Sequence, residues 1–244
     1  MHAASTRLVQ LPEGSDVGAV GHDRMAPVSY QEVLDRIGDA AHRCGRAPSE
    51  ITLVAVSKSK PVSDIGALYE AGHRDFGENR AQEMAEKAAV LPDDIRWHFV
   101  GALQTNKTRL VRPITHLLHS MDRESLAFSW AKGIGLPPPV LIQVNTGSEP
   151  QKAGVEFDEV TALFETLLGL GVEVRGLMAI PPLSDDPEEM RPHFRELRLI
   201  RDQLMQIHGQ VKELSMGMTD DFEIAIEEGA SLIRVGRAIF GSRT

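Results

Sequence analysis

The sequence predicts an α/β fold, a single (β/α)8 TIM-type barrel, and three observations lead to this prediction. Short apolar runs alternate with helical patterns along the chain after about residue 30. The apolar runs are continuous, which is typical of parallel strands that are buried on both faces. The length of 244 residues is usual for one barrel domain.

Eight apolar runs indicate strands, and their alternation with helices implies parallel strands joined by right-handed crossovers. Eight such strands can close into a barrel. An open, doubly wound sheet shows the same alternation, so the pattern alone leaves it as the alternative. The expected strands are residues 51–57, 74–79, 96–101, 116–121, 139–145, 172–180, 212–217 and 231–236.

The helices are expected from apolar residues that recur at three- and four-residue spacing. The first, residues 30–43, carries Val33, Leu34 and Ile37 on one face and precedes the first strand. The next, residues 62–72, closes at Gly72, because glycine commonly follows the last turn of a helix. The remaining expected helices are residues 81–91, 107–111, 124–133, 157–170, 187–209 and 220–229.

Composition narrows the class of protein. Hydrophobic residues make up 42% and charged residues 25%, which is ordinary for a globular domain, and the net charge of -9 disfavours nucleic acid and anionic membranes as partners. Cys44 is the single cysteine, so no intrachain disulfide can form, and a reducing compartment is compatible with this.

The chain has no stretch long and apolar enough to cross a bilayer and no apolar block typical of a secretory signal, so we expect a cytoplasmic protein. Neither a CxxC nor an HExxH pattern is present, and no metal site is predicted. We expect residues 1–26 to form a flexible tail and residues 27–244 to form the barrel domain.

Barrel enzymes and binding proteins build their sites at the carboxyl ends of the strands. The loops after strands seven and eight are a frequent phosphate site, and here Ser215 offers a hydroxyl while Gly217 and Gly236 allow backbone N–H groups to approach an anion. The alternative is that Asp220 and Glu223 form an ordinary capping box for the helix that follows.

An arginine lies inside the last apolar run, "LIRVG". By the two-residue period of a strand, Arg234 shares a face with Gly236 at the barrel mouth. A buried arginine stays protonated and needs a partner, which makes a salt bridge to a barrel carboxylate the structural alternative. Arg237, beside Gly236, is a candidate for helping to bind an anion.

The stretch "VAVSKSKP" (54–61) ends a buried strand in two lysines. Lys58 at this strand end could form a Schiff base with a carbonyl compound, provided that its pKa falls from about 10.4 through burial or a nearby cation. Lys60 is a candidate cation, roughly 7 Å away in an extended strand, and Pro61 favours that extension. The alternative is a lysine at an ordinary solvated strand end.

Four stretches together resemble the pyridoxal phosphate homeostasis proteins, which are related to the N-terminal barrel of alanine racemase. They are "VAVSKSKP" (54–61), "FGENRAQE" (76–83), "WHFVGALQTNKTRLV" (97–111) and "LSMGMTDDFEIAIEEGASLIRVGRAIFG" (214–241). The resemblance extends over residues 30–242 and implies an alanine racemase N-terminal-domain-like barrel with an extra N-terminal helix. It also implies pyridoxal 5'-phosphate as the cofactor.

The resemblance carries roles over to residues of this sequence. It implies that Lys58, rather than Lys60, forms the Schiff base, and that Arg234 lies against the pyridine nitrogen. It places Asn79 near the ring hydroxyl. The phosphate is expected at Ser215, Gly217, Gly236 and the backbone N–H of Arg237. Thr219 stands where many members have serine, and Lys60 and Lys152 are candidates for receiving or releasing the cofactor.

The resemblance favours a carrier over an enzyme. Alanine racemases use a tyrosine from a second domain as a base, and this sequence contains only Tyr30 and Tyr69, both on expected early helices. An arginine at the pyridine nitrogen also makes the ring a poor electron sink. We therefore expect a monomeric pyridoxal 5'-phosphate binding protein without catalysis, which delivers the cofactor to apoenzymes. The alternatives are an amino-acid racemase or decarboxylase, and a barrel that binds another phosphorylated metabolite.

Overall fold

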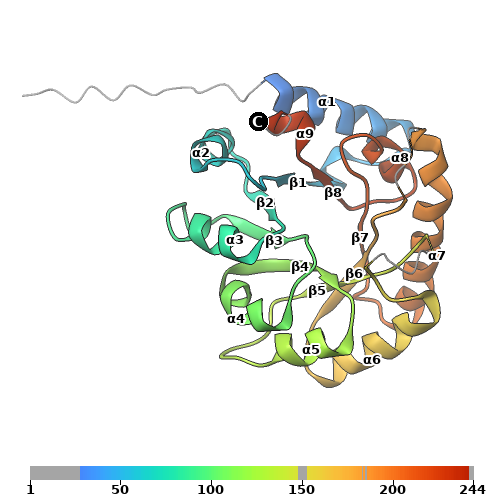
Figure 1. Ribbon diagram of the computed structural model, residues 1–244. Coiled ribbons are helices and arrows are strands. Elements are labelled where there is room, and N and C mark those ends of the chain that lie inside the picture. Colours follow the sequence, from blue (N-terminus) through green and yellow to red (C-terminus); the bar gives the residue numbers. More distant parts are fainter. Residues whose placement is uncertain (1–27, 148–152, 183, 185, 242–244) are drawn as a thin grey trace, which may run out of the picture.

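Eight parallel strands close into one barrel in the computed structural model, which describes residues 28–147, 153–182, 184 and 186–241. The strands follow one another in chain order, and the last pairs with the first, so the barrel is predicted correctly and the open sheet is excluded (Figure 1). The strands are β1 (Thr52–Val56), β2 (Asp75–Glu78), β3 (Arg96–Phe99), β4 (Thr115–Met121), β5 (Val140–Gln143), β6 (Val174–Met178), β7 (Glu213–Ser215) and β8 (Leu232–Val235).

Helices surround the barrel, and each expected helix is present. They are α1 (Val28–Arg43), α2 (Val62–Glu70), α3 (Ala81–Ala88), α4 (Thr108–Val111), α5 (Glu124–Ala131), α6 (Val160–Gly169), α7 (Arg191–Ile207), α8 (Phe222–Glu227) and α9 (Arg237–Phe240). Short 3-10 turns lead into several of them, as Pro187–Met190 leads into α7. These turns account for the earlier starts expected from the apolar pattern.

The observed strands are shorter than the apolar runs that predict them. The run 172–180, for example, forms a strand only over Val174–Met178. Its pairing with β7 covers three residues, Gly176 to Met178. Apolar side chains continue beyond the hydrogen-bonded ladder into the buried parts of the loops, so apolarity overestimates strand length.

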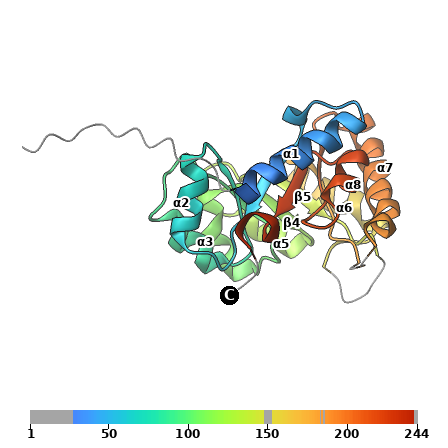
Figure 2. The ribbon, with the colours of Figure 1, turned by 90° about the horizontal axis from the view of Figure 1, so that it is seen from above.

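The first described helix, α1, lies beside α8 and α9, the last two helices of the described chain (Figure 1, Figure 2). Polar contacts fix this position: Arg36 pairs with Glu223 at 2.7 Å, and the Ser29 hydroxyl donates to the Ile239 carbonyl at 2.9 Å. The buried face of α1 consists of Tyr30, Val33, Ile37, Ala40 and Ala41. The helix thus completes the outer layer next to β8 and β1.

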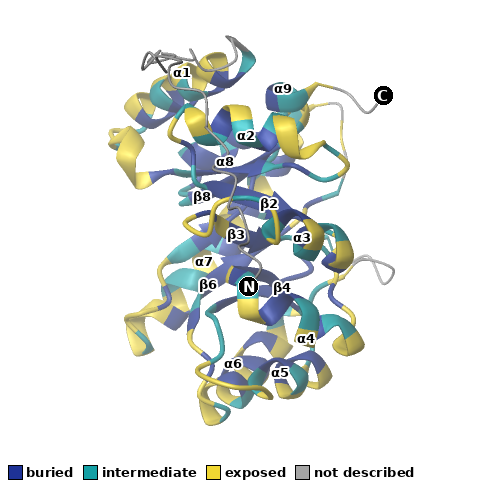
Figure 3. Cartoon of the chain, turned by 90° about the vertical axis from the view of Figure 1, so that its left-hand side faces the viewer, coloured by how far each residue is buried: buried dark blue, intermediate teal, exposed yellow. Residues whose placement is uncertain are grey.

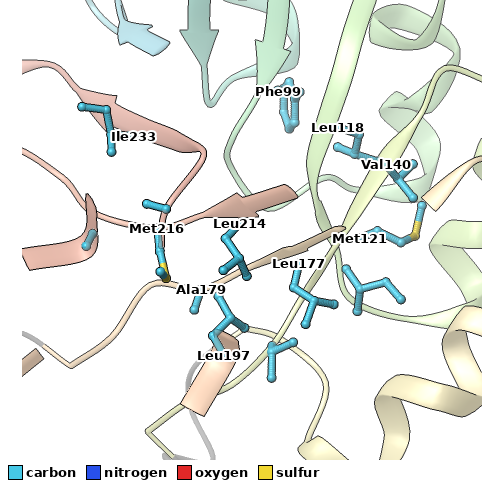
Figure 4. Packing of buried hydrophobic residues seen from close by; sticks show 14 of the residues in the cluster. Phe99, Leu118, Met121, Val140, Leu177, Ala179, Leu197, Leu214, Met216 and Ile233 are labelled. Atoms are coloured by element: carbon cyan, nitrogen blue, oxygen red, sulfur yellow. The ribbon is translucent and has the colours of Figure 1, made fainter. Parts of the chain in front are cut away.

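The main hydrophobic core fills the space between the barrel wall and the helices. Figure 3 shows buried strands inside and exposed residues on the outer helix faces. Figure 4 shows part of this layer, in which Leu177 of β6, Leu214 of β7 and Leu197 of α7 belong to one buried cluster. A second, small cluster consists of Val54, Leu117, Leu141, Met178 and Leu232.

The second cluster belongs to the inside of the barrel, and polar residues share that space. Side chains two positions apart lie on the same face of a strand, so His119 shares the inner face with Leu117, and Arg234 shares it with Leu232. Both polar side chains are buried, at 0% and 4% exposure. Barrel interiors are usually filled by branched apolar residues, so these polar residues mark a departure.

No helix within the described ranges is long and apolar enough to span a membrane. The expected tail, residues 1–26, and Lys152 lie outside the described residues. The division at residue 26 and the role of Lys152 therefore stay predictions.

Candidate functional site

The residues predicted for the site lie at the ends of four neighbouring strands, because β7, β8, β1 and β2 follow one another around the closed barrel. Ser215 ends β7, and Gly217 follows in the next loop. Arg234 lies in β8, and Gly236 and Arg237 lie where α9 begins. Lys58 lies in the turn after β1, and Asn79 directly follows β2. Closure of the barrel thus brings together segments more than 150 residues apart in the sequence.

Lys58 lies in a tight turn, residues 57–60, which we call the Lys58 turn. β1 ends at Val56, and the Lys60 N–H donates to the Ser57 carbonyl at 3.0 Å. Ser59 has φ of +62°, an uncommon left-handed conformation for a residue with a Cβ. Lys58 itself is half-buried.

Lys60 does not lie in an extended strand, contrary to the geometry expected from the sequence. Lys60 does not continue the strand on the same face as Lys58, because the left-handed residue between them turns the backbone. Instead the Lys60 Nζ donates to the Phe240 carbonyl at 2.8 Å, at the end of α9. Lys60 therefore ties the Lys58 turn to the helix that follows β8.

A buried ionic group holds the other side of the turn, and we call it the Lys87 cluster (Ser57, Glu78, Glu83 and Lys87). The Lys87 Nζ donates to the Ser57 carbonyl at 2.8 Å and to Oε1 of both Glu78 and Glu83 at 2.7 Å. The Ser57 hydroxyl donates to Glu78 at 2.7 Å, and the Ser59 N–H donates to Glu83 at 2.5 Å. Burial raises the pKa of the Glu78 carboxyl, while Lys87 and Ser57 oppose that rise.

Arg234 is a buried cation at the centre of the site. Its Nη1 donates to the Ser215 hydroxyl oxygen at 2.6 Å, and its Nη2 donates to the Ala179 carbonyl at 2.9 Å. Burial lowers the pKa of the guanidinium to about 10, although Asp221 opposes this, so the group stays protonated at neutral pH. The alternative of a salt bridge is not found, since no carboxylate of the described residues pairs with Arg234 within 4.0 Å.

Ser215 lies deeper than a phosphate ligand at the mouth needs to lie. Its side chain has no exposure, and its hydroxyl contacts both Arg234 and the Nδ1 of His119, at 2.8 Å. These contacts favour a role beneath Arg234 over the phosphate role expected from the sequence. Thr219, half-buried in the loop after β7, offers the other hydroxyl of this segment.

An ion pair connects the loops after β7 and β8, and a glycine in the first of them adopts a conformation that other residues rarely adopt. Arg237 pairs with Asp220 across the two loops, which neutralises the carboxylate that would repel an anion. Gly217 has φ of +89°, and a Cβ there would lie 2.5 Å from the Ala225 Cβ, so only glycine fits. Since α9 begins at Arg237, its first backbone N–H groups have no acceptor within the helix.

The capping box offered as the alternative at α8 is wrong. The residue that precedes the helix is Asp221, and it makes no side-chain capping bond to the first turn. Its carboxylate instead accepts from the Met218 N–H at 2.5 Å, inside the loop. Glu223 pairs with Arg36 of α1, so packing against the N-terminal helix uses the side chain that the box would need.

Asn79 opens onto a cavity at the ends of β2 and β3. Its Oδ1 is buried without a hydrogen-bond partner in the described part of the protein. The cavity has a volume of about 600 Å³ and includes Arg80, Gln104 and Lys107 in its lining. The Oδ1 itself is shielded from solvent, so a ligand in the cavity reaches it only if the side chain moves, and none of Lys58, Arg234 and Gly236 lines this cavity.

Sequence reasoning missed the polar residues that support the site from below. They are Glu78 and Lys87 under the Lys58 turn, and His98 and His119 inside the barrel. A signal was present, because His98 and His119 interrupt the apolar runs "RWHFVG" and "HLLHSM" as Arg234 interrupts "LIRVG". Which of them meet depends on contacts between strands that one sequence does not specify.

The arrangement combines three chemical capacities at one end of the barrel. Lys58 provides an amine on a fixed turn, Arg234 provides a protonated donor in a desolvated position, and the loops at Gly217 and Gly236 provide close backbone approach. A phosphorylated molecule with a carbonyl group and a ring acceptor would use all three.

Comparisons with known proteins place the chain in a family. A family model described as "Alanine racemase, N-terminal domain" matches residues 35–244. The pyridoxal phosphate homeostasis protein of Aquifex aeolicus is 44% identical over 217 residues, which cover 86% of this chain and 95% of the relative. The protein of the same name from Escherichia coli K12 is 40% identical over 220 residues, with 87% and 94% covered.

Solved structures agree. PipY of Synechococcus elongatus, determined with PLP bound, superposes with a TM-score of 0.72 at 37% identity and covers 86% of this chain and 100% of that one. Alanine racemase from Corynebacterium glutamicum shares the fold, with a TM-score of 0.65 at 18% identity, 86% of this chain and 62% of that one. The chain therefore belongs to the family of pyridoxal phosphate homeostasis proteins, built on the barrel of the alanine racemase N-terminal domain.

Proposed function

We propose that this protein binds pyridoxal 5'-phosphate through Lys58 and serves in its homeostasis as a carrier. The observation that carries the proposal is the pairing of β1 with β8, which sets the Lys58 turn beside the strand that holds the buried Arg234 cation. When bound, the cofactor supplies an aldehyde with which an amine condenses, releasing water. Family membership supports the same cofactor.

The residues present fit the cofactor. Arg234 has five N–H donors but makes only two hydrogen bonds to described residues, so donors remain for a ring nitrogen. The Asn79 Oδ1 has no hydrogen-bond partner among the described residues, and a ring hydroxyl that reached it would supply one. The loops at Gly217, Gly236 and Arg237, with Thr219, offer backbone N–H groups and a hydroxyl to a phosphate. Ser215 contributes by holding Arg234.

Arg234 bears on reactivity as well as on binding. A guanidinium donates hydrogen bonds and cannot accept them, and its pKa of about 10 keeps it protonated at neutral pH. It therefore stabilises the pyridine nitrogen without a proton of its own. Pyridoxal enzymes that stabilise carbanions commonly place an acid there, so Arg234 favours holding the cofactor over catalysis.

The tyrosines support a role without catalysis. The Tyr30 hydroxyl is buried 3.1 Å from His73 Nδ1, and the Tyr69 hydroxyl donates to Asp94 at 2.7 Å. Both partners lie at the amino ends of β2 and β3, whereas the site is at the carboxyl ends. Neither tyrosine is placed to act as a base on the cofactor.

Borohydride trapping tests the covalent step. The protein is incubated with pyridoxal 5'-phosphate, reduced with borohydride and mapped by mass spectrometry. We expect one modified residue, Lys58, with the adduct lost in Lys58→Ala and kept in Lys60→Ala. An adduct that survives Lys58→Ala, or a label spread over surface lysines, would refute the assignment.

The carrier role needs a separate test. Purified holoprotein is mixed with an apo pyridoxal-dependent enzyme, and recovery of that enzyme's activity is compared with recovery in an equal amount of free cofactor. Transfer without turnover of amino acids supports a carrier, whereas racemisation or decarboxylation of an amino acid would establish an enzyme. Monomeric state and cytoplasmic location stay predictions, for light scattering and cell fractionation to check.

A further inference from the structure

A line of buried polar side chains crosses the inside of the barrel, and we call it the interior network (Asp75, His98, His119, Ser215 and Arg234). His98 Nε2 lies 3.0 Å from Asp75 Oδ1, and His98 Nδ1 lies 2.9 Å from His119 Nε2. His119 Nδ1 lies 2.8 Å from Ser215 Oγ, which accepts from Arg234 Nη1 at 2.6 Å. Since β5 and β6 separate β4 from β7 in the wall, the His119–Ser215 contact crosses the interior.

The interior network is closed to water along most of its length. His98 is 2% exposed, and His119 and Ser215 are fully buried. Buried polar groups are costly unless each finds a partner, so the donors and acceptors must match along the whole line. That requirement determines where the hydrogen atoms lie.

The far end of the interior network is an acceptor. Arg96 holds Asp75 with both ends of its guanidinium, Nε at 2.7 Å and Nη2 at 2.5 Å. Although burial opposes it, the hydrogen bonds from Arg96 and His98 hold the pKa of Asp75 well below its usual range. An ionised carboxylate only accepts hydrogen bonds, so the His98 Nε2 must carry a hydrogen.

The remaining hydrogens then follow one direction. Burial, with the nearby His98 and Arg234, lowers the pKa of His119 well below its usual value, so this ring is neutral. If His98 carries its hydrogen on Nε2 alone, its Nδ1 accepts from His119 Nε2–H. The His119 Nδ1 accepts from the Ser215 hydroxyl, whose oxygen accepts from Arg234. Every group donates towards Asp75.

The opposite direction leaves a group without a partner. A hydrogen on His98 Nδ1 would make His119 donate from Nδ1 to Ser215, whose oxygen would then accept from two donors. The Ser215 hydroxyl hydrogen would then need an acceptor. Within the described ranges the hydroxyl contacts only His119 and Arg234, and in this arrangement both are donors. A fully buried hydroxyl without an acceptor is unfavourable, which selects the first direction.

We infer that His98 and His119 are positioning residues for Arg234, and that the interior network holds the guanidinium as a fixed donor from within the barrel. The arrangement links Asp75 and Arg96, at the amino ends of the strands, to Arg234 on the opposite side of the interior. Without His119, the Ser215 hydroxyl loses its acceptor and becomes free to turn its hydrogen towards Arg234. The effect on a bound cofactor rests on the proposed function, whereas the hydrogen-bond directions do not.

The first test uses the protein without cofactor. Nitrogen-15 NMR of histidine-labelled protein reports which ring nitrogen carries hydrogen, with the signals assigned through His98→Gln and His119→Gln. We expect both rings to carry hydrogen on Nε2 and not on Nδ1. Hydrogen on Nδ1 of either ring, or a charged His119 at pH 7, would overturn the inferred direction.

The second test asks whether Arg234 depends on His119. His119→Phe keeps an aromatic ring and removes both nitrogens, so we expect roughly three- to tenfold weaker binding of pyridoxal 5'-phosphate, the loss of about one hydrogen bond. We also expect a shifted visible absorption band, since the ring nitrogen loses its fixed donor. His116→Phe is the matched control, because His116 also packs on His98, with ring centroids 5.5 Å apart, but is exposed and outside the network.

The outcomes separate this inference from the proposed function. Unchanged affinity and spectrum in His119→Phe, or the same change in His116→Phe, would overturn the positioning role. If His119→Phe does not fold, His119→Gln replaces it, with a smaller shift in the same direction expected. A wild-type protein that binds no pyridoxal 5'-phosphate would remove the proposed function, and the NMR result would still decide the direction of the network.

Discussion

The Lys87→Met substitution removes the cation at the centre of the Lys87 cluster beneath the Lys58 turn. Lys87 is 7% exposed at its side chain and Glu78 is 0% exposed. The variant leaves Glu78 with one hydrogen bond, from the Ser57 hydroxyl, because its Oε2 has no partner among the described residues. Removing one member of a buried pair costs about 3–5 kcal/mol. A protein of this size would then melt roughly 6–20 °C lower.

The cost depends on pH in a direction that can be worked out. Burial already raises the pKa of Glu78 above its ordinary 4.5, and loss of Lys87 raises it further. A carboxyl whose pKa is higher in the folded protein binds its proton more tightly there, so it favours folding below about pH 4.5 and loses that effect as the pH rises. The destabilisation by Lys87→Met should therefore grow from pH 5 to pH 8.

Urea unfolding at pH 5 and pH 8 measures both effects. Lys132→Met is the matched control, because Lys132 is exposed, and its replacement should change the free energy of unfolding by less than about 0.5 kcal/mol. Adding Glu78→Gln to Lys87→Met should restore stability at pH 8 and remove the pH dependence. A cost below about 1 kcal/mol at pH 8, or equal costs at both pH values, would refute the buried-pair account.

Three further substitutions test other parts of the structure. A Cβ at Gly176 would lie 1.9 Å from the Glu213 carbonyl oxygen, so Gly176→Ala should cost at least about 3 kcal/mol in urea unfolding, whereas Gly169→Ala meets no atom within 4 Å and should not destabilise. Asp75→Asn should destabilise the protein at pH 6 but progressively less as the pH falls below about 4, because the lowered pKa of Asp75 stabilises the fold only while the group is ionised. Melting curves of the variant and the wild type, recorded at pH 6 and at a series of pH values below about 4, check this. Gly217→Ala, at φ of +89°, should weaken pyridoxal 5'-phosphate binding, measured by absorbance titration, while equal affinity would count against a phosphate at this loop.

The fold follows from the sequence because its signals are local. Continuous apolar runs and helical spacing each report on a few neighbouring residues, and strict alternation leaves few topologies. The Lys58 turn shows the limit of such signals. "SKSK" reads as the end of a strand, yet Ser59 adopts a left-handed conformation that the composition does not indicate. The side chains that hold this turn, Glu83 and Lys87, come from α3.

The sequence predicts the site less completely, because the contacts of the site connect distant strands. The sequence predicts a buried Arg234, with a carboxylate partner as the structural alternative, whereas the observed acceptors are a hydroxyl and a carbonyl. The sequence predicts Ser215 at a phosphate, because the loops after strands seven and eight are a frequent phosphate site and Ser215 offers a hydroxyl. Its contact with His119, 96 residues away in sequence, depends on how β4 faces β7 inside the barrel. One sequence does not specify which side chains meet across the interior of the barrel.

The polar interior raises the question of whether it serves stability or the site, and the double variant His98→Leu/His119→Leu separates the two. Replacing both partners of a buried hydrogen bond by apolar residues of similar shape can be nearly neutral or stabilising. Against this stands the Ser215 hydroxyl, whose lost acceptor costs about 1–3 kcal/mol. Asp75 keeps Arg96, so no charge is left unpaired at that end.

The free energy of unfolding of the double variant should therefore stay within about 3 kcal/mol of the wild type, the cost of the one unpaired hydroxyl. Affinity for pyridoxal 5'-phosphate should nevertheless fall, because Arg234 is no longer held from within. A large loss of stability together with unchanged affinity would mean that the histidines serve the fold. The expected pairing, near-normal stability with weaker binding, would mean that an apolar barrel interior was available to this fold and that the polar one is kept for the orientation of a single guanidinium.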